Sequence, residues 1–336
     1  MTISRVKEID GVLAAAWPQL RVVDAPEPLT GGFWADMWRV RISGQPAPMP
    51  GELVVRFAPH PQMGAKEAEV QRVVAAQGYR TPTVWLSTAS EAPSEGWWCV
   101  MDFASGEPLV PGLGGAAVLH RAPSLVRTVP AQLARIMALL HRLDPQPVTD
   151  AVRTAAPEVA WTVLDVAAQL RLGALAMGRG DVAAALDRLA TLTPLPVRPV
   201  VCHGDLHPFN VLADNGGLTV LDWTGAILAD PCFDVALTEL LLANPPLLLP
   251  APLARVVRAA GRILAGRFVS AYQRANPGVS LEGLVWFRAL HSARVIVDVT
   301  RLRTEHGPDA GGHPWRLVAP AAARNLSAAT GVEVRA

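Results

Sequence analysis

The chain has 336 residues, of which 51% are hydrophobic and 18% are charged, and its formal net charge at pH 7 is +1. This composition excludes an intrinsically disordered chain, and the length is sufficient for two lobes with a substantial core. Only two of the 30 basic residues are lysines, and the arginines form no basic stripe with interleaved aromatic residues, so we expect no nucleic-acid partner.

The cysteines and the hydropathy pattern bear on the compartment. Cys99, Cys202 and Cys232 have no paired spacing, and residues 1–10 are polar and charged without an apolar signal-peptide core. The longest apolar tract, residues 235–257, contains four prolines and two charged residues, which is wrong for a membrane span. We therefore expect a cytoplasmic protein without structural disulfides or a membrane partner, either a monomer or a homodimer.

The first hundred residues have the pattern of strands with one helix. Residues 29–42 predict a strand, a turn at Gly31 and Gly32 and a second strand, and residues 53–57 predict another strand. Two adjacent glycines can turn backbone N–H groups toward an anion, although an ordinary hairpin also explains the pair. Residues 66–78 predict a helix that ends at a glycine.

Helical periodicity increases toward the C-terminus. Residues 97–109 form an apolar strand that runs into a glycine-containing link, for which a plain buried strand is the simple interpretation. From Pro130 onward a helical period dominates, first in residues 130–144. Further helices are expected at residues 160–175, 181–192, 233–243, 252–275 and 281–303.

A run in the middle of the chain is the most informative. It reads H-G-D-L-H-P-F-N over residues 203–210 and is followed by L-T-V-L-D-W. Residues 210–213 and 218–221 predict two strands joined by an Asp-Asn-Gly-Gly turn, which is a strong hairpin signal. Because a hairpin returns the chain on itself, we expect Asn210 at its entrance and Asp222 at its exit to lie side by side.

These residue types suit phosphoryl transfer. Mg²⁺ prefers carboxylate and other oxygen ligands, so Asn210 and Asp222 are candidate metal ligands. Asp205 is the candidate catalytic residue, because an aspartate five positions before an asparagine accepts a hydrogen bond from the attacking hydroxyl in protein kinases. The three side chains predict a magnesium-dependent kinase that acts on a hydroxyl group.

A zinc hydrolase is the competing interpretation. His203, Asp205 and His207 have the spacing i, i+2, i+4 and would lie on one face of a strand. Such a site needs further histidine or carboxylate ligands in recognisable spacing. The other six histidines are scattered singly, at His60, His120, His141, His291, His306 and His313. In the kinase interpretation His203 braces the loop and His207 is structural.

Residues 203–223 resemble the Brenner motif of the aminoglycoside phosphotransferase family, H-G-D-x-x-x-x-N followed by a metal-binding Asp before Trp. Residues 227–236 are similar to the family's G-D-P-x-x-D-L-A segment, in which Asp234 would hold backbone N–H groups of the catalytic loop. The resemblance implies an α+β, two-lobed protein-kinase-like fold. Its small β-rich nucleotide-binding lobe would span residues 1–103, and its larger, mostly helical lobe residues 104–336.

The resemblance also implies which residues bind the nucleotide, with ATP or GTP and Mg²⁺ as the cofactors. Gly31, Gly32 and Phe33 fall in the family's nucleotide-positioning loop. Arg56 on a strand and Glu67 on the following helix would secure the phosphates, as a strand cation and a helix glutamate do in kinase-like sites.

Residues 97–109 are similar to the family's interlobe hinge. In that comparison the carbonyl of Asp102 and the amide of Ala104 would bond the adenine edge, and Met101 would line the base pocket. The chain departs from the family pattern where Arg56 replaces a lysine and where Thr224 replaces a common glutamate. Further departures are the bulky Phe33, Trp34 and Phe209.

The charge distribution bears on the acceptor. Residues 241–336 carry 12 basic and 5 acidic side chains, whereas the two segments before them are each acidic. Relatives that modify polycationic aminoglycosides surround the acceptor with acidic residues. We therefore predict a neutral or anionic hydroxylated acceptor, such as a macrolide, a sugar or another alcohol. A classical aminoglycoside phosphotransferase and a pseudokinase that binds nucleotide or ligand without transfer remain as alternatives, and the arginines also fit a merely solvated surface.

Overall fold

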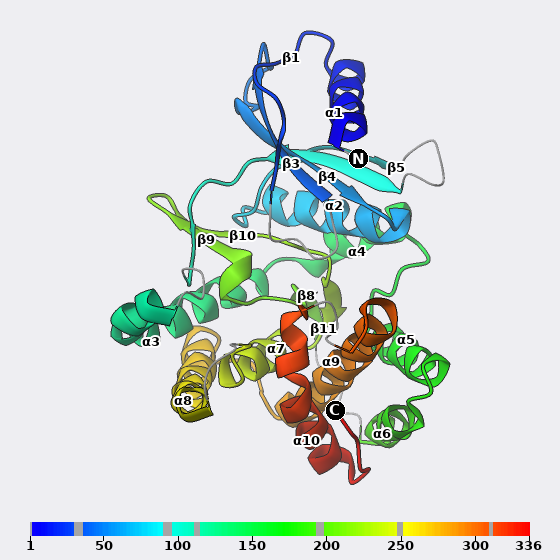
Figure 1. Ribbon diagram of the computed structural model, residues 1–336, viewed down its shortest axis with the longest axis vertical. Coiled ribbons are helices and arrows are strands. Elements are labelled where there is room, and N and C mark those ends of the chain that lie inside the picture. The colour runs from blue at the N-terminus through cyan, green and yellow to red at the C-terminus, as the bar shows by residue number, and fades with distance from the viewer. Residues whose placement is uncertain are drawn as a thin grey trace. The chain divides into compact units, whose positions relative to one another are not determined.

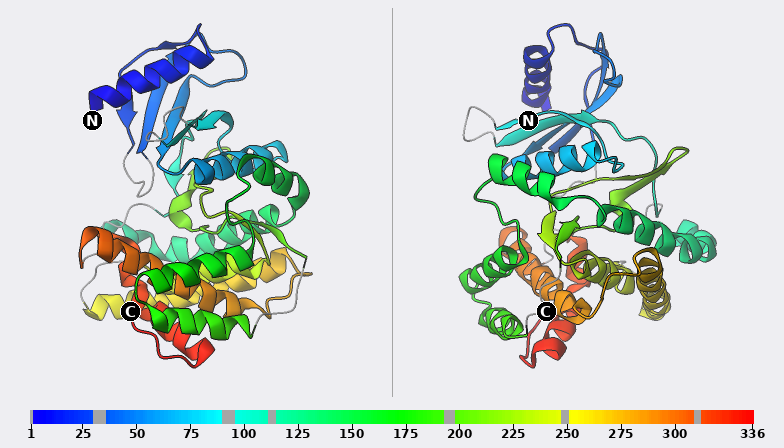
Figure 2. Two further views of the ribbon diagram at one scale, coloured as in Figure 1. Left: turned by 90° about the vertical axis from the view of Figure 1, so that its right-hand side faces the viewer. Right: turned by 180° about the vertical axis from the view of Figure 1, so that it is seen from behind.

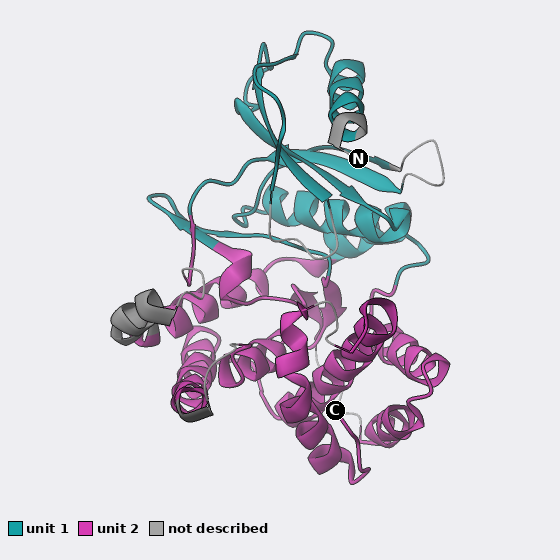
Figure 3. Cartoon of the chain, in the orientation of Figure 1, with its two compact units in different colours: residues 1–106, 146–159, 212–224 teal, residues 107–145, 160–211, 225–336 magenta. Residues whose placement is uncertain are grey.

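The computed structural model describes residues 2–29, 36–89, 96–110, 115–192, 198–246, 251–308 and 312–336. The chain forms two compact units (Figure 3). Unit 1 comprises Met1–Gly106, Gln146–Val159 and Leu212–Thr224, and unit 2 comprises Glu107–Pro145, Ala160–Val211 and Gly225–Ala336. Two later segments thus join the N-terminal residues in unit 1. The lobe boundary expected after residue 103 stays a prediction.

An antiparallel sheet with the strand order β1-β3-β4-β6-β5 forms the centre of unit 1 (Figure 1). Its strands are β1 (Arg21–Val22), β2 (Glu27–Pro28), β3 (Asp36–Ser43), β4 (Glu52–Ala58), β5 (Val84–Ala89) and β6 (Trp97–Asp102). The short β2 pairs with β3. The helices of unit 1 include α1 (Thr2–Ala16), α2 (Pro61–Ala76) and, from Gln146 on, α4 (Pro145–Ala155).

The two faces of the sheet are covered by different helices (Figure 2). Val55 of β4 packs in one hydrophobic cluster with Leu13 of α1, and Val54 packs in another with Ala68 of α2. Because side chains alternate along a strand, Arg56 shares the face of Val54 and lies toward α2. The same alternation that builds the core therefore delivers one cation to the α2 side.

Helix α2 approaches the sheet closely. A Cβ atom added to Gly64 would lie 2.2 Å from the ring of Trp97, so only a glycine fits at this contact. The helix begins at Pro61, earlier than the predicted residue 66, because proline at a first helical position has no N–H to leave unpaired. The helix ends at Ala76, and it is followed by Gly78, whose φ of +86° is left-handed.

The predicted central hairpin is confirmed. β9 (Val211–Asp214) and β10 (Gly217–Val220) pair with each other, and Asp214 accepts a hydrogen bond from the Gly216 amide at 2.7 Å. Arg80 ties the hairpin to the rest of unit 1, since it donates to Asp214 at 2.7 Å and its carbonyl accepts from Val220 N–H at 3.0 Å. Asp222 lies two residues after the end of β10.

Unit 2 is mostly helical. Its helices are α3 (Gly115–Leu140), α5 (Val163–Ala176), α6 (Gly180–Ala190), α7 (Cys232–Ala243), α8 (Ala251–Ala275), α9 (Leu284–His306) and α10 (Ala319–Thr330), with the short 3₁₀ turns η1 (Pro208–Asn210) and η3 (Pro314–Leu317). Its short strands are β7 (Glu107–Pro108), β8 (Val200–Cys202) and β11 (Ile227–Ala229), of which β8 and β11 pair antiparallel. The helices predicted after residue 160 are confirmed as α5 to α9.

The core of unit 2 surrounds α7. Phe233, Ala236 and Leu237 of that helix are fully or almost fully buried, and they belong to one cluster with Leu290 of α9 and Leu326 of α10. Because most residues of α7 are apolar and buried, the helix lies inside the helical bundle rather than on its surface. It therefore offers a rigid support for whatever its polar residues hold.

The fold confirms the predicted class. An N-terminal antiparallel sheet precedes a helical C-terminal region, which is the predicted α+β arrangement. All three cysteines are buried and free. Among the described residues, no helix is long and apolar enough to cross a membrane.

Replacing Gly64 with alanine should destabilise the chain by about 1–3 kcal/mol or more, because the new methyl group collides with Trp97 across the α2–sheet contact. The matched control is Gly11→Ala in α1, where nothing lies within 4 Å of the added Cβ. That substitution should stabilise the chain by about 0.5–1 kcal/mol through helix propensity. Urea unfolding of both variants measures the two effects, and equal midpoints would contradict the close packing.

Candidate active site

A buried ion pair joins β4 to α2 in unit 1. One guanidinium nitrogen of Arg56, Nη1, lies 2.9 Å from Oε1 of Glu67, and the two side chains are only 8% and 5% exposed. Burial alone would lower the pKa of Arg56, but the carboxylates of Glu67 and Asp222 outweigh it and raise that pKa, so the guanidinium stays charged. Burial raises the pKa of Glu67, and Arg56 opposes that rise. The predicted strand cation and helix carboxylate are thus brought together.

Asp222 has an unusual backbone. Its φ is 64°, and it is the single residue other than glycine with a positive φ in the described chain. Trp223 holds this conformation, because its buried ring donates from Nε1 to Oγ1 of Thr81 at 2.9 Å and meets Tyr79 edge to face at 5.7 Å. A strained backbone persists only where its surroundings determine it, and such positions cluster at functional sites.

The carboxylate of Asp222 reaches the ion pair through one oxygen. Oδ1 accepts from the Thr224 hydroxyl at 2.6 Å and lies 3.7 Å from Nη2 of Arg56. The same hydroxyl lies 3.0 Å from Oε2 of Glu67 and 3.2 Å from Nη2 of Arg56. Sequence reasoning noted Thr224 only as a departure from a family pattern and missed this position between three charges. Its place two residues after Asp222 was the available signal.

The predicted nucleotide-base residues lie on β6 and just after it. Met101 is buried and its sulfur accepts from Gln71 at 3.5 Å, while the carboxylate of Asp102 accepts from Trp85 Nε1 at 2.6 Å and from Thr83 N–H at 3.1 Å. These two hydrogen bonds hold the side chain of Asp102 at the end of the sheet. Ala104 is half-buried in the segment that follows.

The glycine loop lies outside the described residues. Gly31, Gly32 and Phe33 fall in residues 30–35, which are not among the residues that the structure describes. Their role in nucleotide binding stays a prediction.

In unit 2, the loop after β8 is held by Asp234 of α7. The carboxylate accepts from the His203 amide at 2.8 Å and from the Gly204 amide at 2.7 Å, which confirms its predicted structural role. Gly204 has a φ of +72°, and an added Cβ would lie 1.9 Å from the Gly225 carbonyl oxygen. The loop can take this path only with glycine at that position.

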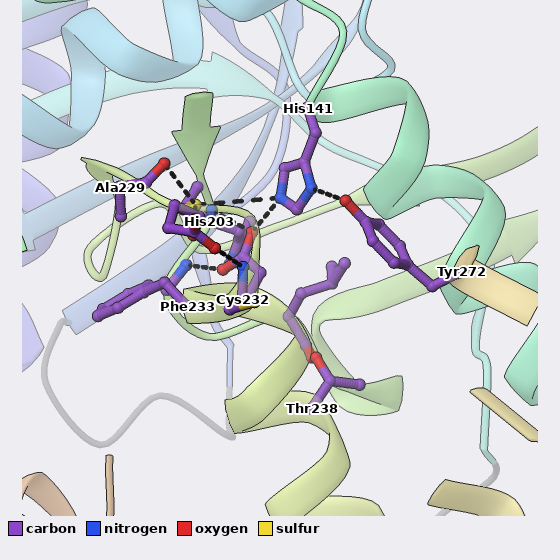
Figure 4. A network of polar contacts seen from close by, with 12 residues as sticks. His141, His203, Ala229, Cys232, Phe233, Thr238 and Tyr272 are labelled. Atoms are coloured by element: carbon purple, nitrogen blue, oxygen red, sulfur yellow. Dashed lines mark hydrogen bonds and ion pairs between the residues drawn. The ribbon is translucent and has the colours of Figure 1, made fainter. Parts of the chain in front are cut away.

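Asp234 belongs to a network of buried polar groups, in which Figure 4 labels His141, His203 and Tyr272. His141, the residue directly after α3, contacts Asp234 Oδ2 through Nε2 at 3.1 Å and the Tyr272 hydroxyl of α8 through Nδ1 at 2.7 Å. Burial would raise the pKa of Asp234, but His141 and the loop amides outweigh it and lower that pKa, so the carboxylate stays ionised. Three helices thereby fix one loop.

Asp205 and Asn210 lie together on that loop. Nδ2 of Asn210 donates to the backbone carbonyl of Asp205 at 2.9 Å and lies 3.4 Å from its Oδ2, and His207 Nε2 lies 3.6 Å from the same oxygen. Burial would raise the pKa of Asp205, but His207, Arg294 and His203 lower it below its ordinary value. Within the described chain, Oδ1 of Asp205 is buried without a hydrogen-bond partner.

Sequence reasoning missed Arg294 of α9. Its Nη1 donates to the Gly204 carbonyl at 2.8 Å, and its guanidinium carbon lies 5.2 Å from the ring centroid of Trp315. Asp298 bridges Arg294 and Arg301 at 3.8 and 3.4 Å. The spacing i, i+4, i+7 of these three residues on one helix face was the available signal.

The zinc interpretation is not supported by the geometry. Nδ1 of His203 accepts from the Asp205 amide at 3.2 Å, and Nδ1 of His207 accepts from the Phe209 amide at 3.3 Å, so each ring supports the loop backbone. Among the described residues, the one convergent group of metal-compatible side chains is His141, Cys202 and Asp234. Burial raises the pKa of Cys202, and both oxygens of Asp234 already accept loop amides, so this group reads as structural.

Asn210 and Asp222 have side chains whose chemistry suits a magnesium ion. Asn210 and Asp222 both offer hard oxygens, as Mg²⁺ prefers. Because Nδ2 of Asn210 donates to Asp205, its Oδ1 remains an acceptor. Within the described residues, no hydrogen bond reaches Oδ2 of Asp222. Each residue therefore fits a magnesium ligand, and whether they share one ion stays a prediction.

Comparison with known proteins decides the family. A model of the phosphotransferase enzyme family matches residues 26–277, which is well over half of the chain. The chain belongs to that family. No curated protein matches the sequence.

The fold is shared with solved phosphotransferases at low sequence identity. A protein of Ralstonia eutropha JMP134, named provisionally as an aminoglycoside phosphotransferase, has a TM-score of 0.65 at 15% identity over 96% of this chain and 98% of that one. An aminoglycoside 2″-phosphotransferase solved with GDP and kanamycin has a TM-score of 0.59 at 19% identity, over 93% and 97%. The macrolide 2′-phosphotransferase of Brachybacterium faecium has a TM-score of 0.52 at 19% identity, over 95% and 98%.

Asp234→Asn should lower the free energy of unfolding by about 3 kcal/mol at pH 7, because it removes a buried charge that holds two amides and a histidine. The lowered pKa of Asp234 means that its contribution is present above the unfolded-state pKa of about 3.9 and is lost as the pH falls through the folded value. The difference between the two chains should therefore narrow below about pH 4.

Urea unfolding at pH 7 and pH 3.5 measures this change. The control is Asp187→Asn, which removes an exposed carboxylate paired with Arg171 and should leave stability nearly unchanged. An unfolding midpoint of the Asp234 variant equal to that of wild type at both pH values would contradict the structural role.

Proposed function

We propose that the protein transfers the γ-phosphate of ATP or GTP to a hydroxyl group of a small molecule. The observation that carries the proposal is the loop at Asp205, whose Oδ1 is unpartnered within the described chain and whose backbone is clamped by Asp234 and Asn210. A rigid loop that presents one ionised carboxylate is what orientation of an attacking hydroxyl requires. Membership of the phosphotransferase enzyme family supports it.

Asp205 is proposed as the catalytic residue. Its lowered pKa keeps the carboxylate ionised at neutral pH, so it can accept a hydrogen bond from the acceptor hydroxyl and then the proton. His207 and Arg294 contribute positive charge that favours this ionised form. Asp205 and His207 lie on the loop that Asp234 of α7 holds, and Arg294 lies on α9. All three are therefore anchored to the core of unit 2.

Unit 1 supplies the proposed nucleotide contacts. Arg56 would bind phosphate oxygens with its planar guanidinium, and Glu67 would hold it in place. The Asp102 carbonyl and the Ala104 amide would bond the base beside Met101, with Gly31, Gly32 and Phe33 covering the phosphates. Nucleotide use is supported by solved relatives, one with GDP and kanamycin and another with AMP-PNP and hygromycin B.

Asn210 and Asp222 are the proposed Mg²⁺ ligands. When bound, the ion would neutralise charge on the phosphates. The residues of the chain do the rest: Asp222 presents an oxygen from a fixed backbone, and Asn210 offers its amide oxygen from the loop.

The acceptor is proposed to be neutral or anionic rather than polycationic. Near the loop at Asp205, α9 places Arg294 and Arg301 on either side of a single carboxylate, Asp298. A site for a polycation would need an excess of carboxylates there. Solved structures of the same fold include macrolide as well as aminoglycoside phosphotransferases, so the fold accommodates both acceptor classes.

A second candidate is a nucleotide-binding pseudokinase. It is favoured by the contact of Arg56 with Asp222 at 3.7 Å, which engages the proposed metal ligand in an internal ion pair. Such a protein would bind Mg²⁺ and nucleotide without transferring phosphate.

Phosphate transfer to a panel of neutral, anionic and polycationic alcohols tests the proposal. We expect turnover by the wild-type chain with a neutral or anionic member, and loss of kcat by at least about a hundredfold in Asp205→Asn with little change in the KM for nucleotide. The control is Asp150→Asn, an exposed carboxylate on α4.

Transfer by the Asp205 variant at the wild-type rate would remove the catalytic assignment. Nucleotide binding without transfer to any alcohol would instead support the pseudokinase, and preference for the polycationic members would contradict the acceptor proposal.

A further inference from the structure

The hydroxyl of Thr224 occupies the centre of the charged groups in unit 1. Its Oγ1 lies 2.6 Å from Asp222 Oδ1, 3.0 Å from Glu67 Oε2 and 3.2 Å from Arg56 Nη2. The backbone N–H of Thr224 also lies 3.4 Å from Asp222 Oδ1. One side chain of unit 1 therefore contacts all three charged groups.

The hydroxyl of Thr224 cannot satisfy all three of these groups at once. A threonine hydroxyl has one proton to donate and two lone pairs to accept with. Arg56 carries only donors, so the hydroxyl accepts from it. Two carboxylates, Asp222 and Glu67, then face a single proton, and it can serve only one of them at a time.

The distances indicate which carboxylate is served. The contact with Asp222 is shorter than that with Glu67 by 0.4 Å, the difference between 2.6 and 3.0 Å. Glu67 meanwhile keeps its other oxygen on Arg56 at 2.9 Å. Turning the proton from Asp222 to Glu67 requires only rotation about the Cβ–Oγ1 bond, with no movement of the backbone.

We propose that Thr224 is a positioning residue that couples the phosphate-binding cation Arg56 to the metal-binding carboxylate Asp222. In the metal-free chain its hydroxyl holds Asp222. When a divalent cation takes that carboxylate, the hydroxyl donates to Glu67 and keeps this buried charge paired. The inference rests on the proposed function, since it assigns Arg56 to phosphate and Asp222 to the cation.

The coupling has a specific consequence. In the wild-type chain, a cation that takes Asp222 frees the hydroxyl to donate to Glu67, whose side chain is 5% exposed against 38% for Asp222, so the hydrogen bond gained is stronger than the one lost. A chain without the hydroxyl cannot make this exchange. Binding of nucleotide with metal should therefore suffer more than binding of nucleotide alone. A merely structural role of Thr224 would weaken both equally.

The experiment measures the dissociation constant of AMP-PNP, and of GMP-PNP in parallel, with excess Mg²⁺ and with EDTA, by calorimetry on the full chain. The readout is the factor by which Mg²⁺ strengthens binding. Thr224→Val, which keeps the shape and removes the hydroxyl, should reduce that factor roughly tenfold, the value of a hydrogen bond to a charged group. Thr224→Ser, which keeps a hydroxyl group, should retain the wild-type factor.

Matched variants make the result decisive. Thr304→Val removes an exposed hydroxyl on α9 that donates to the Thr300 carbonyl, and it should keep the wild-type factor. Thr224→Ala is a second hydroxyl-free variant for use if the valine side chain prevents folding, as judged by thermal unfolding without ligand.

Two outcomes separate the inference from the function on which it rests. In the first, Mg²⁺ strengthens nucleotide binding by the wild-type factor in both Thr224→Val and Thr224→Ala, or both variants lose the same affinity with and without Mg²⁺. Either result would overturn the role of Thr224 and leave the proposed function standing. Failure of the wild-type chain to bind either nucleotide would contradict the proposed function itself.

Discussion

The guanidinium of Arg56 is a charge buried between a sheet and a helix, and the polar groups of unit 1 are arranged around it. A buried cation must be paired, because breaking such a pair costs about 3–5 kcal/mol. The alternation of β4 places Arg56 on the α2 face, where Glu67 meets it at 2.9 Å. Asp222 and Thr224 complete the surroundings from the end of the central hairpin. Core packing and charge pairing therefore depend on the same register.

Unit 2 applies the same physics with the opposite charge. Asp234 is a buried carboxylate whose two oxygens accept the amides of His203 and Gly204, with His141 behind them. Satisfying that anion fixes the path of the loop, and the loop in turn carries Asp205 and Asn210. In each unit the partners of a buried charge thus determine the local geometry, and the proposed catalytic and metal-binding side chains lie beside those partners.

Much of this could be predicted from the sequence, where local signals and motif spacing agreed. The central hairpin followed from the Asp-Asn-Gly-Gly turn, and the loop-holding role of Asp234 followed from a motif resemblance. Local rules failed where tertiary packing decides. The helical period was recognised only from Pro130 onward, but α3 begins at Gly115 and continues through that proline.

Other features were missed, because the contacts that give them their role join residues far apart in the chain. Thr224 acquires its position from Arg56 and Glu67, more than a hundred and fifty residues earlier. Arg294 acquires its position from the Gly204 carbonyl, ninety residues earlier. The roles of Gly31, Gly32 and Phe33 and the sharing of one ion by Asn210 and Asp222 stay predictions.

An experimental structure of the chain with Mg²⁺ and AMP-PNP tests the central claim most directly, because it locates the phosphates relative to the buried charge of unit 1. We predict phosphate oxygens against the guanidinium of Arg56 and a cation bound to Asp222, with the Arg56–Glu67 pair intact. Phosphates bound elsewhere, or a cation that leaves Asp222 without contact, would contradict it.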